Sequence, residues 1–283
     1  MELKKAQKKQ VKLRLGMSGA SGFGKTYSAL LLAYGMVGDW SKIAVIDTEN
    51  DSASLYANLG DFNSLPLTAP FTPERYIQAI EMCEKAGMEV IIIDSISHEW
   101  EGKGGCLELH NELGGQFIHW AKITPRHNAF IQKILQSTCH IITSVRRKQD
   151  YDMVKNEKGK TEPVKVGLKE VTREGFEYEL TVNFEFINDK HLVKASKDRT
   201  GLFMNNPEFV ITAETGKSII NWCNDGEKVK EITITDAIEK MNLPKNNMSE
   251  VVAVWSKCKE CQTHESFIKA KDKQKELLTP KSE

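Results

Sequence analysis

The sequence lacks an excess of charge of either sign, and it lacks any long apolar run. Among its 283 residues, 39 are lysine or arginine and 39 are aspartate or glutamate, so the formal net charge is +0. This balance gives no overall indication of nucleic-acid binding. No apolar stretch approaches the ~20 residues that a membrane-spanning helix needs, and the charged N-terminus has no apolar signal segment. These absences predict a soluble, cytoplasmic protein with no membrane contact.

Cysteine is sparse, and its spacing does not suit a zinc site or a disulfide framework. The six cysteines are scattered at positions 83, 106, 139, 223, 258 and 261. Only Cys258 and Cys261 form a C-x-x-C pair, and no second pair stands nearby to complete the four ligands of a structural zinc. His264 adds one ligand and leaves the set incomplete. We interpret the pair as two reduced thiols one helical turn apart.

Positive charge is concentrated at the N-terminus. Within residues 1–14 the only acidic residue is Glu2, whereas the basic residues are Lys4, Lys5, Lys8, Lys9, Lys12 and Arg14. Such an arm suits contact with a phosphate backbone. It suits a solvated tail equally well, and the sequence leaves both interpretations open.

The sequence does contain a glycine-rich octet, directly after an alternating apolar run at residues 11–17. The octet comprises Gly19, Ala20, Ser21, Gly22, Phe23, Gly24, Lys25 and Thr26. Its spacing is the P-loop pattern G-x-x-x-x-G-K-[ST], in which backbone N–H groups of a curled loop point at phosphate oxygens. In this pattern Lys25 reaches the β- and γ-phosphates and the Thr26 hydroxyl ligates Mg²⁺. A strand before and a helix after the octet favour an ATP–Mg²⁺ site over a plain turn.

Strand patterns alternate with helical patterns along the first half of the chain. Strands are expected at residues 11–17, 42–47, 89–94 and 140–145, and helices at 27–34, 72–86 and 116–136. This order is typical of βαβ units and predicts an α/β fold, a P-loop NTPase core with a mainly parallel sheet flanked by helices. The most apolar strand ends in Asp94, where a P-loop protein carries the acidic residue that holds the Mg²⁺ water shell. A helix cap is the alternative role for Asp94.

The second half of the sequence has a different character. Residues 155–173 are polar and rich in lysine, which predicts a mobile hairpin or loop, and residues 177–187 and 191–195 predict an antiparallel strand pair. We expect the core domain to cover residues 1–225. Residues 226–283 are expected to form a linker and a small helical module, with Ser249 as the cap of its second helix.

A second acidic position follows the strand expected at residues 42–47. The segment reads Ile46-Asp47-Thr48-Glu49, and Tyr56-Ala57 comes shortly after it. Here the sequence resembles the RecA superfamily, whose second core strand ends in I-D-x-E and is followed by a similar L/I-Y-A. The resemblance implies that Glu49 polarises the water that attacks the γ-phosphate and that Asp47 is structural. A helix cap is the alternative role for Glu49.

A further motif, Lys197-Asp198-Arg199-Thr200-Gly201, is similar to the K-x-R-x-G signature of the RadA and DnaB branches. The resemblance implies that Lys197 and Arg199 reach the nucleotide of a neighbouring subunit, where they stabilise the charge of the transition state. The protein is then a homo-oligomer, a ring or a filament, with shared active sites. An exposed basic turn is the alternative. One departure concerns Ser144, which stands where RecA has a γ-phosphate-sensing glutamine; Arg146 is a possible substitute, or else part of a solvated strand end.

Taken together, residues 11–223 resemble the compact RecA-like ATPases of bacteriophages, described as phage nucleotide-binding or AAA-family proteins. The resemblance implies an ATPase stimulated by single-stranded DNA, working in phage recombination, single-strand annealing or replication in the host bacterial cytoplasm. It also implies a phage or host recombination or replication partner for the C-terminal helices.

Two segments are candidates for contact with the DNA strand. These are residues 101–115 and 155–173, and Trp100 and Trp120 beside the first segment are either stacking or core residues. Two other functions remain open, a nucleotide-dependent switch with little turnover and a P-loop small-molecule kinase. The kinase is disfavoured because the sequence has no recognisable arginine-rich lid.

Overall fold

The structure of the protein is a computed structural model, which describes residues 8–155, 161–226, 234–243, 247–258, 262 and 264–278. The chain divides into two units, Met1–Gly226 and Glu227–Glu283. Each unit has its own hydrophobic core and is described by itself.

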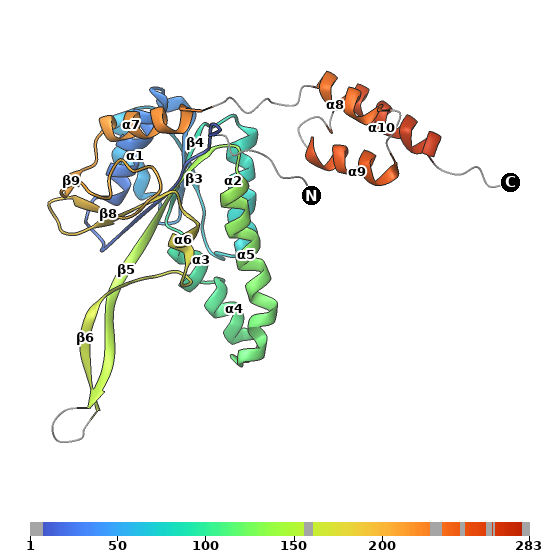
Figure 1. Cartoon of the computed structure of the whole chain (residues 1–283). Coiled ribbons are helices and arrows are strands. Elements are labelled where there is room, and N and C mark those ends of the chain that lie inside the picture. Colours follow the sequence, from blue (N-terminus) through green and yellow to red (C-terminus); the bar gives the residue numbers. More distant parts are fainter. Residues whose placement is uncertain are drawn as a thin grey trace. The chain divides into compact units, whose positions relative to one another are not determined.

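The first unit is built on one mixed sheet (Figure 1). Among the described residues its strands are β1 (Arg14–Gly19), β2 (Ile43–Asp47), β3 (Asn63–Pro66), β4 (Val90–Asp94), β5 (His140–Lys155), β6 (Thr161–Glu170), β7 (Val182–Phe186), β8 (Leu192–Asp198) and β9 (Phe209–Val210). Their order is β3-β2-β4-β5-β1-β7-β8-β9, and β6 pairs with β5. The pairs from β3 to β7 are parallel, which confirms the predicted mainly parallel sheet, and only β6, β8 and β9 run antiparallel to their neighbours.

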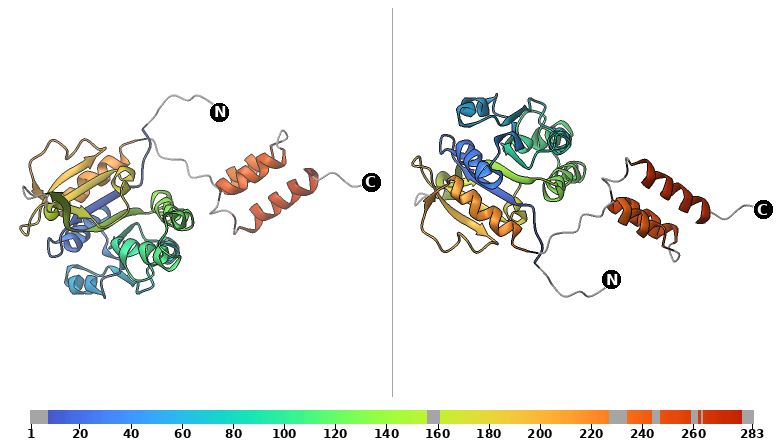
Figure 2. Two further views of the ribbon diagram at one scale, coloured as in Figure 1. Left: turned by 90° about the horizontal axis from the view of Figure 1, so that it is seen from below. Right: turned by 90° about the horizontal axis from the view of Figure 1, so that it is seen from above.

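Helices cover both faces of this sheet (Figure 2). They are α1 (Lys25–Val37), α2 (Pro73–Lys85), α3 (Ser97–Glu101), α4 (Cys106–Glu112), α5 (Trp120–Gln136), α6 (Phe176–Glu179) and α7 (Ala213–Asn224), with 3-10 turns η1 (Trp40–Lys42), η2 (Ser52–Leu59) and η3 (Phe117–His119). Helices α1 and α7 pack together on one face, and α2 and α5 pack together on the other. The predicted P-loop NTPase core is therefore confirmed.

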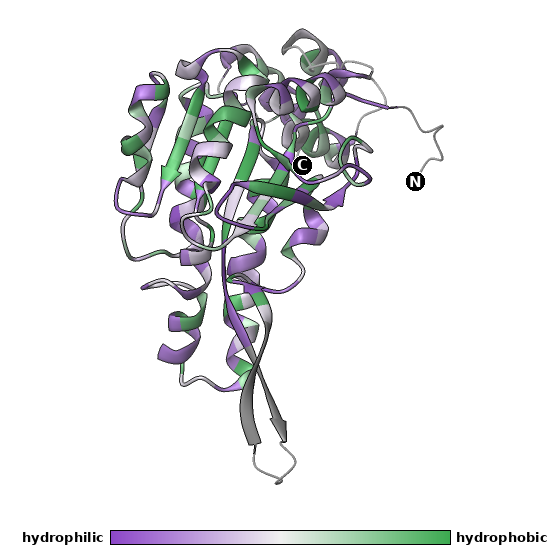
Figure 3. Cartoon of the chain, turned by 90° about the vertical axis from the view of Figure 1, so that its left-hand side faces the viewer, coloured by the Kyte–Doolittle hydropathy of each residue, from purple (hydrophilic) through white to green (hydrophobic). Residues whose placement is uncertain are grey.

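The central strand β4 shows why its sequence is apolar throughout. Val90 and Ile92 point into the core beneath α1, whereas Ile91 and Ile93 point into the core beneath α2 and α5. Alternate side chains of a strand face opposite sides of a sheet, so a strand covered on both sides has no position for a polar residue until it ends. Figure 3 shows these apolar strands between helices whose outer faces are polar. The first polar position after the run is Asp94, at the carboxyl edge of the sheet.

A glycine contact brings α1 and α7 unusually close together. A Cβ atom added to Gly216 would lie 2.1 Å from the carbonyl oxygen of Leu32, and one added to Gly35 would lie 1.9 Å from that of Ala213. Both positions therefore require glycine, because a side chain would push the two backbones apart. Neither glycine belongs to a motif that can be recognised in the sequence.

The lysine-rich segment forms a hairpin, the first of the two alternatives expected for residues 155–173. Strand β5 continues beyond the sheet to Lys155, and β6 returns antiparallel to it, with a register shift between Asp150 and Tyr151. The β5–β6 hairpin projects well beyond the rest of the unit (Figure 1). Residues 156–160 lie outside the described residues, as do residues 1–7 of the basic arm.

Two further predictions in the first unit are wrong. The strand expected from Glu177 starts only at Val182, because Gly175 in a left-handed conformation (φ 93°) begins α6, which buries Phe176. Arg14 is not available to a phosphate backbone, since its guanidinium is buried and donates to the carbonyl oxygens of Leu135 and Ser137, among others. Burial lowers the pKa of Arg14 to about 10.

Residues 101–115 do not form an open loop. The segment contains the end of α3, a tight glycine turn and α4, and it packs against Pro70 and Phe71. Trp100 and Trp120 stack on one another with ring centroids 5.6 Å apart. Both tryptophans also line a groove of about 1220 Å³, together with the exposed Phe117 and Ile118.

The second unit consists of α8 (Ile234–Met241), α9 (Met248–Lys257) and α10 (Glu265–Leu278). Its core contains Val251 and Phe267, and Trp255 stacks on Phe267. The cap of α9 is Asn247, which forms a capping box with Glu250, so the prediction of Ser249 is wrong by two residues. Cys258 is buried after the last residue of α9, which contradicts a pair within one helix, and Cys261 lies outside the described residues. Every helix in the described part of the chain is too short or too polar to cross a bilayer.

Candidate nucleotide-binding site

The glycine-rich octet forms the turn from β1 into α1, at the carboxyl edge of the sheet. Gly22 and Gly24 have φ angles of 81° and 87°, a left-handed conformation that favours glycine. A Cβ atom at Gly24 would lie 2.6 Å from Nδ1 of His191, which stands over the loop and contacts the carbonyl oxygen of Phe23 at 2.9 Å. The left-handed backbone and the nearby ring of His191 therefore both require glycine at position 24.

Lys25 is buried at the start of α1 and points back over the loop. Its Nζ donates to the carbonyl oxygens of Gly19 at 3.0 Å and Ala20 at 2.9 Å. Burial lowers the pKa of Lys25, while the nearby carboxylates of Asp94 and Glu49 act in the opposite direction. An anion that enters the loop offers this ammonium group a stronger partner than two neutral carbonyl groups.

Thr26 and Asp94 meet across the sheet edge. The Thr26 hydroxyl donates to Oδ2 of Asp94 at 2.5 Å, and the Ser144 hydroxyl donates to Oδ1. Strand β5 lies between β1 and β4, so Ser144 stands between the P-loop and the strand of Asp94. Burial raises the pKa of Asp94, and the two hydroxyl donors oppose that shift. The carboxylate is thus held in place by two elements before any ligand binds.

Glu49 stands after β2 and faces Arg146. Nε of Arg146 lies 2.8 Å from Oε1 of Glu49, and both side chains are about one third exposed (35% and 28%). Asp47 accepts hydrogen bonds from the backbone N–H groups of Glu49 and Ala53, as expected for a structural residue. The backbone at Glu49 is therefore fixed by Asp47, whereas its carboxylate is held by an arginine from β5.

A cavity of about 460 Å³ joins these groups. It is lined by Ser21, Gly22, Gly24, Lys25, Thr26, Tyr27, Glu49, Ser52, Leu55, Tyr56, Asp94, Arg146 and His191. The structure therefore brings the glycine-rich octet, Glu49 and Asp94 to one place.

Lys197 and Arg199 do not line this cavity. Nζ of Lys197 donates to the carbonyl oxygen of Glu177 at 2.8 Å, and Arg199 donates to that of Tyr178 at 2.9 Å. The register explains their position. Asp198 pairs with Val182, which pairs with Leu15, whereas the P-loop starts after Gly19. The K-x-R-x-G segment thus lies four residues away along the strand direction, about 13 Å from the carboxyl edge of the sheet.

Three residues of the site were not predicted from the sequence. Ser144 was noted only as a departure, but its hydroxyl fixes Asp94. His98 contacts the hydroxyl of Thr48 at 2.7 Å, and His191 covers the P-loop from the turn between β7 and β8. Neither histidine belongs to a local motif, because each reaches the site from a different part of the chain.

The residues present fit a nucleotide with a divalent cation. The curled glycine loop and Lys25 suit phosphate oxygens, and the hydroxyl of Thr26 beside the carboxylate of Asp94 supplies the oxygen donors that Mg²⁺ prefers. A bound divalent cation would neutralise phosphate charge. Thr26 and Asp94 would hold the ion, with Ser144 orienting the carboxylate.

A family model described as an AAA domain matches residues 11–211. The match therefore includes the P-loop, Glu49, Asp94 and the segment with Lys197 and Arg199. A search of curated proteins finds no match to the chain.

Proposed function

The chain belongs to this AAA domain family of P-loop ATPases, and on that premise we propose that it is a RecA-like ATPase that acts on single-stranded DNA. The position of Glu49 carries the proposal. Glu49 follows β2 and lines the same cavity as Lys25 and Asp94. A carboxylate at this place can accept the proton of a water molecule that attacks the γ-phosphate.

The Glu49 carboxylate has two possible partners, Arg146 and the attacking water molecule. Nε of Arg146 lies 2.8 Å from Oε1 of Glu49. A γ-phosphate is a stronger partner for the guanidinium than one carboxylate, so Arg146 turns to the phosphate and releases Glu49 to the water. Arg146 thereby takes the place of the RecA glutamine as the residue that senses the γ-phosphate.

The positions of Lys197 and Arg199 support a shared active site. Both lie away from their own cavity, beside the backbone of Glu177 and Tyr178. If a neighbouring subunit places this segment against the P-loop, its Lys197 and Arg199 bring two positive charges beside the phosphates. The proposed assembly is a homo-oligomeric ring or filament.

The β5–β6 hairpin is the proposed DNA-contacting element. Strand β5 carries Ser144 and Arg146 at the cavity and then continues without interruption into the hairpin. A change at Arg146 is therefore transmitted along one strand to an element that projects from the unit (Figure 1). We further propose that the helical second unit docks a recombination or replication protein of a phage or its host.

A nucleotide-dependent switch with little turnover is a second candidate function. The ion pair between Arg146 and Glu49 favours it, because a glutamate that stays paired cannot activate water. Turnover measurements distinguish the two functions.

The test is ATP hydrolysis with and without single-stranded DNA. We expect hydrolysis to rise with DNA and to be lost in Lys25→Ala and Glu49→Gln chains, of which the second still binds ATP. Glu208→Gln is the matched control, because Glu208 is exposed and lies outside the cavity. Turnover that DNA leaves unchanged would contradict the DNA role, and ATP binding without turnover would favour the switch.

Mixed subunits test the shared site. Glu49→Gln and Arg199→Ala chains are each inactive alone, but a mixture contains interfaces at which both residues are intact. We expect mixing to restore hydrolysis. If no mixing ratio restores activity in a preparation that still forms oligomers, Arg199 does not act on a neighbouring subunit.

A further inference from the structure

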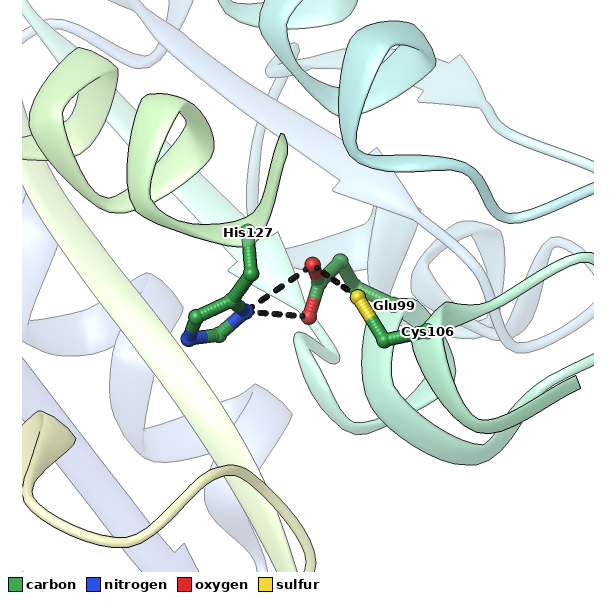
Figure 4. A group of neighbouring side chains, drawn as sticks. All are labelled: Glu99, Cys106 and His127. Atoms are coloured by element: carbon green, nitrogen blue, oxygen red, sulfur yellow. Dashed lines mark hydrogen bonds and ion pairs between the residues drawn. The ribbon is translucent and has the colours of Figure 1, made fainter. Parts of the chain in front are cut away.

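A buried cluster of three potential metal ligands lies away from the nucleotide cavity. The carboxylate of Glu99 is 3.0 and 3.1 Å from Nδ1 of His127 and 3.1 Å from Sγ of Cys106 (Figure 4). All three residues are less than 5% exposed, and their ligand atoms lie within 4.8 Å of one another. No residue of the cluster lines the cavity of the P-loop.

The three residues come from three different helices. Glu99 lies in α3, Cys106 is the first residue of α4, and His127 lies in the middle of α5. A tight turn returns the chain from α3 to α4: Gly104 has a φ of 76°, and a Cβ atom at Gly105 would lie 2.7 Å from the carbonyl oxygen of Glu99. The glycine-rich segment is thus shaped so that Cys106 comes back onto Glu99.

We propose that Glu99, Cys106 and His127 bind a Zn²⁺ ion. Thiolate, imidazole and carboxylate are the three ligand types of zinc in proteins. A thiolate and a carboxylate balance the two positive charges of the ion, so the occupied site is neutral and suits a buried position. Three protein ligands leave one coordination position for water.

The distances from Glu99 to the other two ligands require little movement. With zinc–ligand bonds of about 2.0 to 2.3 Å in tetrahedral geometry, ligand atoms stand roughly 3.3 to 3.6 Å apart. The separations of Glu99 from His127 and Cys106 are 3.0 to 3.1 Å, so they must open by only a few tenths of an ångström. In the metal-free chain the Cys106 thiol donates its proton to Glu99, and binding the ion releases that proton.

A bound zinc ion would hold α3 in place, and α3 contacts residues at the nucleotide cavity. Helix α3 begins at Ser97, whose hydroxyl accepts from the backbone N–H of Arg146, and His98 contacts Thr48 beside Glu49. A metal bond from Glu99 to α4 and α5 fixes α3 from its other side. The proposed effect on α3 does not depend on the proposed ATPase activity.

Cobalt substitution is the test, because Co²⁺ takes zinc sites and a thiolate ligand gives it an intense charge-transfer absorption. Mg²⁺-type oxygen sites, including Thr26 and Asp94, give no such band. We expect the full chain to bind one Co²⁺ with a thiolate band and to hold one zinc after dialysis. Zinc is also expected to raise Tm by several degrees.

Variants locate the sulfur ligand. Cys106→Ser should lose the band, whereas Cys139→Ser should keep it, because Cys139 is an equally buried thiol that donates to the backbone of Met88. A chain with both Cys258→Ser and Cys261→Ser should also keep the band. His127→Gln, which can still hydrogen-bond to Glu99, should lower cobalt affinity at least tenfold.

Three results would overturn the proposal: no thiolate band in the full chain, a band that persists in folded Cys106→Ser, or a band that disappears with the two C-terminal cysteines. If Cys106→Ser does not fold, the full chain, the C-terminal double variant and His127→Gln decide the question. In that case two results together count against the site. The double variant keeps the band, and the His127→Gln chain binds cobalt as tightly as the parent chain.

Discussion

At the scale of single residues, the nucleotide cavity is held by pairs that a phosphate can replace. Lys25 is bound to carbonyl oxygens, Thr26 to Asp94, and Arg146 to Glu49. Lys25 and Arg146 must exchange these partners for phosphate oxygens when a nucleotide binds, whereas Asp94 stays fixed by Ser144. Burial lowers the pKa of Lys25, and the charges of Asp94 and Glu49 oppose this shift while that of Arg146 adds to it.

Arg146 is expected to affect turnover more than binding. An Arg146→Ala chain should lose about 10- to 100-fold in kcat with less than a threefold change in KM for ATP, since both the sensing cation and the orientation of Glu49 are lost. Arg146→Lys should recover part of the activity. Lys148→Ala is the control, because Lys148 pairs with Glu101 outside the cavity. Unchanged kcat in Arg146→Ala would exclude a sensing role.

His140 makes folding stability depend on pH. Its Nδ1 accepts the backbone N–H of Leu13, and burial lowers its pKa from 6.5 to about 3. Because the folded pKa lies below the unfolded value, this stability is complete above pH 6.5 and is lost as pH falls toward 3. Between pH 8 and 5 the free energy of unfolding should fall by about 2 kcal/mol from this group.

Denaturant titrations at several pH values check that expectation. A His140→Gln chain keeps a hydrogen-bond acceptor but does not titrate, so its stability should fall by about 2 kcal/mol less over the same range. His264→Gln serves as the control, because His264 is exposed. An identical pH dependence in His140→Gln and the parent chain would show that another group is responsible.

At the scale of elements, the close contact of α1 and α7 is decided by glycine. In an isolated helix, Gly216→Ala would add about 1 kcal/mol of stability. In this fold the new methyl group would meet the carbonyl oxygen of Leu32 at 2.1 Å, a backbone atom that cannot rotate away. We therefore expect Gly216→Ala to lower the free energy of unfolding by about 1–3 kcal/mol.

Urea denaturation measures this effect. The control is Ser218→Ala, an exposed position two residues further along the same helix, which should change stability by less than about 0.5 kcal/mol. A stabilised Gly216→Ala chain would mean that α7 can move away from α1 without cost.

The elements also show where sequence patterns succeed. The apolar run that ends in Asp94 and the helix expected at residues 72–86 depend on neighbours in the sequence, and both form, the helix as α2 with Thr72 as its cap. The strand expected from Glu177 does not begin there, because Gly175 starts a short helix. A hairpin was one alternative for residues 155–173, but the continuation of β5 from Val145 to Lys155 was not expected, because β5 and β6 are stabilised there by pairing with each other and not by an apolar pattern.

At the scale of the whole molecule, two units with separate cores follow one another in the chain. The residues that line the nucleotide cavity all belong to the first unit. A chain that ends at Gly226 is therefore expected to fold and to bind ATP with an affinity within about twofold of the full chain. Calorimetric titration with nucleotide checks this expectation, and a tenfold loss of affinity would show that the second unit contributes to the site.

The sequence by itself determined the parts of this protein that are local. The P-loop, the strand that ends in Asp94 and the position of Glu49 after β2 depend on residues that are close together in the sequence. Local backbone conformation is enough to place such residues relative to one another. The tertiary structure alone decided which distant groups meet: Ser144 on Asp94, Arg146 on Glu49, and His127 with Cys106 on Glu99. These contacts depend on strand order and helix packing, which place residues together regardless of their separation in the chain.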